Sequence, residues 1–150
     1  MTALTEHSVT DMEQRHVTDV AELENIIFSS PWSEKSLAEC VGGENTLFLV
    51  CEKDGRTVGY VGCYTVCDDA AITNVAVHPD HRRQGIAKAL VKALISRASE
   101  RGCAQVSLEV RVSNASAIAL YEKLGFRSVG IRRGFYSKPR EDALIMIYEI

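Results

Sequence analysis

The chain contains 150 residues, of which 46% are hydrophobic and 25% are charged, with a formal net charge of −3 at pH 7. This composition is typical of one globular domain spanning residues 1–150, and no apolar stretch approaches the ~20 residues that a membrane-spanning helix needs. The slightly acidic charge argues against a nucleic-acid-binding protein, whose surface usually carries a broad basic face, and the first residues lack signal-peptide features, so we expect a cytoplasmic protein.

The first third of the chain predicts one short strand and two helices. Residues 8–12 are predicted to form the strand, and residues 19–28 carry apolar side chains at the spacing of an amphipathic helix. Pro31-Trp32 interrupts that pattern. Ser33 is a favourable N-cap residue, so it predicts a second, short helix that ends near Cys40.

The middle of the chain predicts three strands joined by tight turns. Residues 46–51 and 57–66 are rich in β-branched and aromatic residues, and they flank Asp54-Gly55, a strong signal for a β-hairpin. We expect a second turn at Asp68-Asp69, followed by a strand over residues 70–77.

The last part of the chain alternates helices and strands. The pattern predicts a helix over residues 85–101 capped by Gly102, a strand over 105–110, a helix over 114–124 closed by Gly125, and final strands over 126–135 and 143–149. Because strands 70–77 and 105–110 are joined through a helix, they should be parallel neighbours. The fold class is therefore α/β (α+β) with a mixed sheet, and not a doubly wound parallel sheet.

Five cysteines are present, and they show no pattern of a disulfide framework or of a zinc site. Their number is odd, and no Cys-x-x-Cys pair occurs. The four histidines likewise lack metal-ligand spacing. We expect buried, reduced thiols and no metal; the cysteines are Cys40, Cys51, Cys63, Cys67 and Cys103.

A strand-to-helix turn over residues 82–88 is the most informative motif. It places a glycine and several backbone N–H groups at the start of a helix, where these donors have no partner within the helix and the dipole is positive. Such a turn can bind the phosphates of a nucleotide-bearing cofactor, although it could also be an ordinary loop. Its residues are Arg82, Arg83, Gln84, Gly85, Ile86, Ala87 and Lys88.

Three further polar residues should gather at the same edge of the sheet. Glu109 ends the strand after the glycine turn, Asn114 begins the next helix, and Tyr121 follows two helical turns later. Ligands of open α/β sheets bind beyond the carboxyl ends of the strands, which is where these residues should lie. Each also has an ordinary role open to it: a solvated strand end for Glu109, a helix N-cap for Asn114 and a tyrosine at the core edge for Tyr121.

These motifs resemble the GNAT acetyltransferase superfamily. Arg82-x-x-Gly85-x-Ala87 is similar to its pyrophosphate-binding signature, and residues 114–126 are similar to its second cofactor-binding helix. Other segments match one branch, the bacterial RimI-type ribosomal-protein-alanine N-acetyltransferases, and together the matches cover nearly the whole chain. These segments are 28–33, 108–114, 132–136 and 141–143.

The resemblance implies a splayed central sheet of about seven strands flanked by about four helices, with acetyl-CoA as co-substrate and no metal. The acceptor would be a protein N-terminus beginning with alanine, from a small-subunit ribosomal protein, with no nucleic acid or membrane partner. Glu109 would be the general base, Tyr121 the general acid, and Trp32 and Tyr136 would contact the acceptor. The cofactor would contact Val75, Ala76, Val77, the turn residues Arg82 to Lys88, and Asn114.

Two other functions stay open on the sequence. A GNAT enzyme could instead acetylate a lysine side chain or a small amine. The second alternative is a catalytically inactive acyl-CoA-binding module. The joint presence of Glu109, Asn114 and Tyr121 argues against this hypothesis. The sequence excludes a nucleotide kinase with a P-loop, because no Gly-x-x-x-x-Gly-Lys-Ser/Thr motif occurs.

Overall fold

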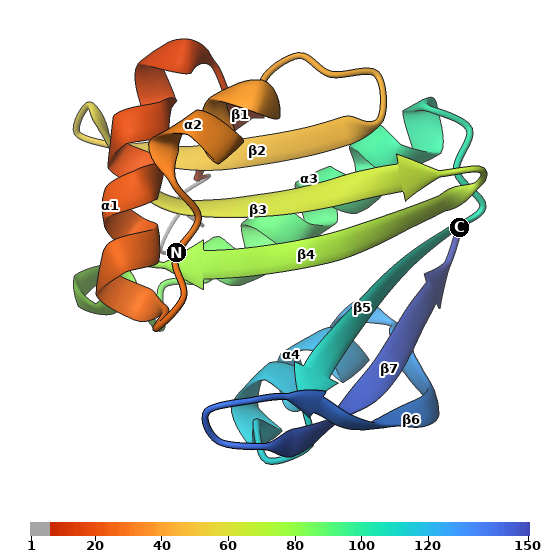
Figure 1. The fold of residues 1–150 in the computed structure, drawn as a ribbon. Helices are drawn as coiled ribbons and strands as arrows, with labels where there is room; N and C mark the ends of the chain where they lie inside the picture. The colour runs from red at the N-terminus through yellow and green to blue at the C-terminus, as the bar shows by residue number, and fades with distance from the viewer. Residues whose placement is uncertain (1–6) are drawn as a thin grey trace, which may run out of the picture.

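A mixed seven-stranded sheet with helices on both faces makes up the fold in our computed structural model, which describes residues 7–150 (Figure 1). The strands are β1 (Ser8–Asp11), β2 (Thr46–Lys53), β3 (Arg56–Val66), β4 (Asp69–Val77), β5 (Gln105–Arg111), β6 (Arg127–Tyr136) and β7 (Glu141–Glu149). The α-helices are α1 (Val17–Ile27), α2 (Glu34–Glu39), α3 (Ile86–Glu100) and α4 (Ala115–Leu124). Two single 3-10 turns, η1 (Gln14–His16) and η2 (Pro79–His81), precede α1 and α3.

The strand order is β1-β2-β3-β4-β5-β7-β6. All neighbouring strands are antiparallel except β4 and β5, which are parallel, as the sequence predicts. The predicted order of elements, the seven strands and the four helices are confirmed. The two 3-10 turns were not predicted.

Turn chemistry explains the first hairpins of the sheet. Lys53 pairs with Arg56 across the two-residue turn Asp54-Gly55, whose φ angles are 52° and 77°, as the right-handed twist of a hairpin requires. The turn predicted at Asp68-Asp69 lies one residue earlier, at Cys67-Asp68. Asp69 already pairs with Val66 as the first residue of β4, and Cys67 takes the positive φ.

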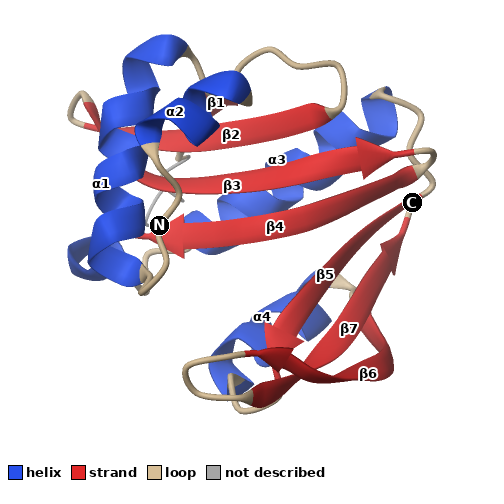
Figure 2. Cartoon of the chain, viewed as in Figure 1, coloured by secondary structure: helices blue, strands red, loops and turns tan. Residues whose placement is uncertain are grey.

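The sheet separates two hydrophobic cores. Helices α3 and α4 pack on one face, where Leu90, Leu94 and Ala98 of α3 are fully buried. Helices α1 and α2 pack on the other face, through Val20 and Leu37 among others (Figure 2). Alternation along the strands divides their side chains between the two cores.

The cysteine prediction is confirmed at four of the five positions. Cys40, Cys51, Cys63 and Cys103 are buried and free, whereas Cys67 is free but exposed, because it lies in the turn between β3 and β4. No helix within residues 7–150 is long and apolar enough to cross a membrane.

Candidate active site

Strands β4 and β5 pair only briefly and then separate. Their parallel pairing covers three residue pairs, from Asp69 with Gln105 to Ala71 with Ser107. Beyond Ala71 the strands diverge into a V that is open at their carboxyl ends (Figure 1). The backbone of β4 on this side, including the predicted cofactor contacts Val75, Ala76 and Val77, is therefore not paired with β5. The splay that the resemblance implies is confirmed.

The side chains of these three residues already serve the two cores. Val75 and Val77 pack against the α3 face, and Ala76 is buried on the α1 and α2 face. Any contact with a ligand inside the V would therefore come mainly from their backbone groups.

The predicted phosphate turn lies directly after β4. Gly85 is the N-cap residue of α3, with a left-handed φ of 78°, and no side chain caps the helix there. Arg83 also has a positive φ, of 61°. The two left-handed residues lie just before the helix, and the first N–H groups of α3 have no hydrogen-bond partner within the helix.

The side chains of the turn divide into two groups. Arg82, Arg83 and Lys88 are exposed, so their charges are available to an anion. Ile86, which is also predicted to contact the cofactor, is only 1% exposed and belongs to the α3 core. Only its backbone can therefore contact a ligand. Gln84 is held from outside the turn, because its Oε1 accepts a hydrogen bond from Lys53 Nζ at 2.7 Å.

Glu109 and Tyr136 are brought together at the edge of the V. Glu109 lies on β5, on the face opposite the buried Leu108 and Val110, and 28% of its side chain is exposed. The Tyr136 hydroxyl donates to the Glu109 backbone carbonyl at 3.1 Å. Arg132 of β6 lies beside the carboxylate, with Nη2 3.4 Å from Oε1.

Arg111 organises the β6–β7 turn around this group. Its guanidinium lies 4.4 Å from the centre of the Tyr136 ring, and it donates to the backbone carbonyls of Ser137 and Pro139. It also pairs with Glu141, whose other carboxylate oxygen accepts from the Ser113 N–H. Hydrogen bonds from Ser113 and Arg111 lower the pKa of Glu141. The turn is thus fixed to the end of β5.

Tyr121 of α4 is a buried tyrosine. Only 8% of Tyr121 is exposed, and its ring meets Phe126 edge-on at 5.6 Å between centroids. Burial, with a smaller contribution from the neighbouring Tyr136, raises the pKa of Tyr121 to about 12. The pKa of Tyr136 is also raised, chiefly by burial and then by Glu109. At neutral pH Tyr121 therefore holds a proton that it could donate.

Asn114 has the N-cap role that the sequence left open. Its Oδ1 accepts from the backbone N–H of Ala117 at 3.2 Å and from the Ser116 hydroxyl at 3.3 Å. This contact starts α4 and so places Tyr121. The amide nitrogen of Asn114 takes no part in the cap.

Trp32 lies in the loop between α1 and α2. Its ring packs against Phe48 at 6.0 Å and Tyr64 at 6.4 Å between centroids. With Ser36 and Cys40 it lines a hollow of about 620 Å³ on the α2 side of the sheet. The contacts found for Trp32 do not join it to Tyr136, the other residue expected at the acceptor.

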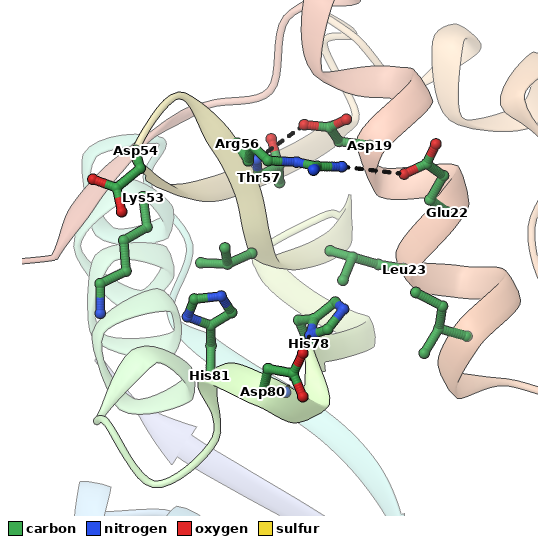
Figure 3. Close-up of a pocket in the computed structure, with 12 residues that line it drawn as sticks. Asp19, Glu22, Leu23, Lys53, Asp54, Arg56, Thr57, His78, Asp80 and His81 are labelled. Atoms are coloured by element: carbon green, nitrogen blue, oxygen red, sulfur yellow. Dashed lines mark hydrogen bonds and ion pairs between the residues drawn. The ribbon is translucent and has the colours of Figure 1, made fainter.

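A second hollow, of about 370 Å³, lies at the end of the sheet between α1, the β2–β3 turn and η2 (Figure 3). Asp19 accepts there from the Thr57 N–H at 3.0 Å, and Arg56 pairs loosely with Glu22 at 3.9 Å. None of the site residues expected from the sequence lines this hollow. Among residues 7–150, no group of three His, Cys, Asp or Glu side chains is placed to hold a metal ion.

Sequence reasoning missed several residues of the site. The family resemblance includes Arg111 and Arg132 only as members of the matching segments 108–114 and 132–136, and no sequence pattern marks Lys53. Their contacts join strands that are far apart in the sequence, so no local spacing could reveal them. The one available signal was the unusual density of charge in residues 132–142.

Comparisons with known proteins identify the family of this chain. The model of the acetyltransferase (GNAT) family matches residues 17–126. The ribosomal protein bS18-alanine N-acetyltransferase of Escherichia coli K12 is 39% identical over 146 residues, covering 96% of this chain and 98% of the relative. The Salmonella typhimurium enzyme of the same name is 40% identical over 131 residues, covering 86% and 88%.

A solved structure points the same way. The crystal structure of the ribosomal-protein-S18-alanine N-acetyltransferase from Escherichia coli superposes with a TM-score of 0.86 at 39% identity, covering 96% of this chain and 94% of that one. The chain therefore belongs to the GNAT acetyltransferase family and, within it, to the group of ribosomal-protein-alanine N-acetyltransferases, which are acetyl-CoA-dependent enzymes.

Proposed function

We propose that this protein acetylates the α-amino group of an N-terminal alanine, and that its natural acceptor is ribosomal protein bS18. The names of its relatives supply the acceptor. The observation that carries the proposal in this chain is the hydrogen bond from Tyr136 to Glu109 beyond the point where β4 and β5 separate, and the buried Tyr121 supports it as a protonated phenol. An acceptor made on the ribosome also suits the cytoplasmic location that we expect.

Acetyl-CoA would lie in the V between β4 and β5. The backbone of Val75, Ala76 and Val77 would pair with its pantetheine arm, because these peptide groups have no partner on β5. The N–H groups of residues 83–88 would bind the pyrophosphate, with added charge from the exposed Arg82, Arg83 and Lys88. A backbone N–H near Val77 would polarise the thioester carbonyl.

Glu109 would serve as the general base. A protein α-amino group has a reference pKa near 8, so most of it is protonated at neutral pH and cannot attack a carbonyl. The carboxylate of Glu109 is partly exposed, so it can be reached by the amine or by one bridging water. The free amine would then attack the thioester carbonyl directly. No covalent acyl-enzyme intermediate is needed.

Tyr121 would protonate the departing thiolate. Its raised pKa keeps the phenol protonated across the neutral range, as a general acid requires. Asn114 starts the helix that carries Tyr121, and its free amide nitrogen would bind the cofactor. Trp32 and Tyr136 would line the path of the acceptor chain on either side of the amine.

Mass spectrometry tests this proposal. The protein is incubated with acetyl-CoA and a mixture of peptides with free N-terminal alanine, peptides with a blocked N-terminus and free lysine, and polyamines. We expect one added acetyl group, located by fragmentation on the alanine α-nitrogen and strongest on the bS18 N-terminal peptide. Acetylation only of lysine or polyamines would support a different acceptor class. Binding of acetyl-CoA without transfer to any of them would indicate an inactive acyl-CoA-binding module.

A further inference from the structure

Glu24 of α1 is a carboxylate buried completely, and it lies outside the group of residues assigned to the chemistry. Its residue is 0% exposed. Burying a charged side chain is costly unless hydrogen bonds replace the lost water. The hydrogen bonds of Glu24 therefore identify the segments that this carboxylate holds together.

Three neutral donors converge on Glu24 from three different segments. Oε1 accepts from the Trp32 backbone N–H at 2.9 Å. Oε2 accepts from the Tyr60 hydroxyl at 2.7 Å and from Asn74 Nδ2 at 3.3 Å. Asn74 Nδ2 also reaches the Tyr60 oxygen at 3.0 Å, so the group is closed on itself. Burial, and then the Glu24 carboxylate, raises the pKa of Tyr60, which keeps it a donor.

The first contact fixes the loop between α1 and α2, residues 28–33. The backbone carbonyl of Glu24 accepts from the Phe28 N–H at 2.9 Å, where α1 ends, and its side chain accepts from Trp32 four residues later. The chain thus folds around this one residue. The Trp32 ring then rests on Phe48, which stacks on Tyr60 at 6.2 Å between centroids.

The second contact fixes the opposite wall of the proposed site. Asn74 lies on β4 beyond the last residue paired with β5, and it immediately precedes Val75, Ala76 and Val77. Its side chain points to the α1 face, as do Ala76 and, on β5, Glu109. One buried carboxylate therefore ties the loop expected at the acceptor to the strand expected at the thioester.

We infer that Glu24 is a positioning residue for the acceptor: it holds the 28–33 loop at a fixed distance from the β4 edge, so that the amine and the thioester meet in a productive arrangement. This inference rests on the proposed function. Positioning of this kind affects catalysis strongly, because small displacements of a bound reactant cost rate.

Glu24→Gln tests the inference with little change in shape. A carboxylate offers acceptor sites to all three donors, whereas the glutamine amide has one oxygen and turns its own NH₂ toward a donor. We expect the KM for the acceptor peptide to rise by about tenfold or more, while the dissociation constant of acetyl-CoA alone changes by less than about twofold. An unchanged acceptor KM, or an equal loss of acetyl-CoA affinity, would overturn the inference.

A spectroscopic measurement separates this inference from the identity of the acceptor. Trp32 is the single tryptophan of the chain, so its fluorescence reports on the 28–33 loop. In Glu24→Gln without substrates, we expect emission shifted to the red and faster quenching by acrylamide. Unchanged fluorescence would refute the anchoring of the loop. Failure of the wild-type protein to acetylate N-terminal alanine would instead refute the proposed function and leave the fluorescence result standing.

Tyr60→Phe is the matched control, because it removes one donor to Oε2 and leaves the Trp32 contact in place. We expect its Trp32 emission to match the wild type and its acceptor KM to stay within about threefold. Equal effects in both variants would mean that the group only stabilises the fold, which overturns the inference. Should Glu24→Gln fail to fold, Glu24→Asp keeps the charge but cannot reach both sides, and it should change the fluorescence and the acceptor KM in the same direction.

Discussion

Glu109 and Tyr121 lie in unlike surroundings that suit unlike roles. Glu109 is partly exposed and faces the Arg132 guanidinium, so water and an amine can both reach it. Tyr121 is almost fully buried, and burial disfavours its phenolate form. A base has to be accessible and a proton donor has to stay protonated, so the environment of each side chain matches the role proposed for it.

Glu109→Gln should lower kcat by about 100-fold or more, because the amide cannot take a proton from the ammonium group. Acetyl-CoA binding, measured by titration without acceptor, should stay close to the wild-type value, since the carboxylate lies outside the phosphate turn. Glu122→Gln on the exposed face of α4 is the control and should be fully active. Full activity of Glu109→Gln would falsify the role of this residue as base.

Tyr121→Phe keeps the buried ring and removes only the hydroxyl, so it should lower kcat by about 100-fold. The loss should be smaller with an acyl donor whose thiol leaves more easily, because a better leaving group needs less help from an acid. Steady-state kinetics with the two donors measures this difference. A loss of less than about threefold with acetyl-CoA would point to another proton donor.

The same variant should alter stability at high pH. The phenol titrates near 10 in the unfolded chain and, with its pKa raised to about 12, later in the folded protein. Its contribution to the free energy of unfolding is therefore complete below pH 10 and is lost as the pH rises through about 12. Denaturant unfolding between pH 9 and 12 should show a shallower decline in Tyr121→Phe than in the wild-type protein.

Helix α3 is flanked by two glycines that share a left-handed backbone conformation but have different expected roles. Gly85 precedes its first residue with φ of 78°, and Gly102 follows its end with φ of 84°. A Cβ would meet nothing within 4 Å at Gly102 and only His7 Nε2, at 3.9 Å, at Gly85. Both ends therefore need glycine for the backbone alone, but only the first end is expected to bind phosphate.

Gly85→Ala and Gly102→Ala should therefore destabilise the fold by similar amounts, about 1–2 kcal/mol for a left-handed alanine. Only Gly85→Ala should also weaken acetyl-CoA binding, by about tenfold or more, because it disturbs the N–H groups of the turn. Calorimetric titration and thermal unfolding of the two variants separate these effects. Equal acetyl-CoA affinities would show that the phosphate site lies elsewhere.

The molecule as a whole is two cores on the two faces of one sheet, and this division determines the reactivity of its thiols. Burial raises the pKa of Cys63 to about 12 and also raises the pKa values of Cys51 and Cys103. Thiolates are the reactive form of cysteine, so these residues should be inert in the folded protein. Cys67 lies in the turn between β3 and β4 and is exposed, so its thiol is accessible to reagents.

Cys40 borders the hollow beside Trp32 but is only 6% exposed, so a thiol reagent should modify one cysteine per native chain, and all five only after denaturation. Cys67→Ser should abolish the reaction of the native protein and should leave acetyl transfer unchanged, because Cys67 lies at the end of the sheet remote from Glu109. Absorbance titration measures both counts. Rapid reaction of a second thiol would mean that one of the cores opens readily.

Local sequence signals were sufficient to predict the helices and strands and the glycine turn before α3. The Asp54-Gly55 hairpin, the Ser33 and Asn114 caps and the helix after Gly85 are fixed by residues adjacent in the chain, and all four are confirmed. The error at Asp68-Asp69 arose because Cys67 adopts a positive φ that is uncommon for a non-glycine residue. Here strand register overrode the preference of Asp for turns.

The sequence by itself determined the order of strands and helices, the parallel β4–β5 pair and the family, because these depend on periodicity, caps and motifs that are local. Only the tertiary structure decided which distant side chains meet. Arg111 spans the β6–β7 turn, Arg132 faces Glu109, and Glu24 joins α1 to Trp32 and Asn74. Such contacts depend on how strands and helices far apart in the chain pack together, and residue spacing carries no record of that packing.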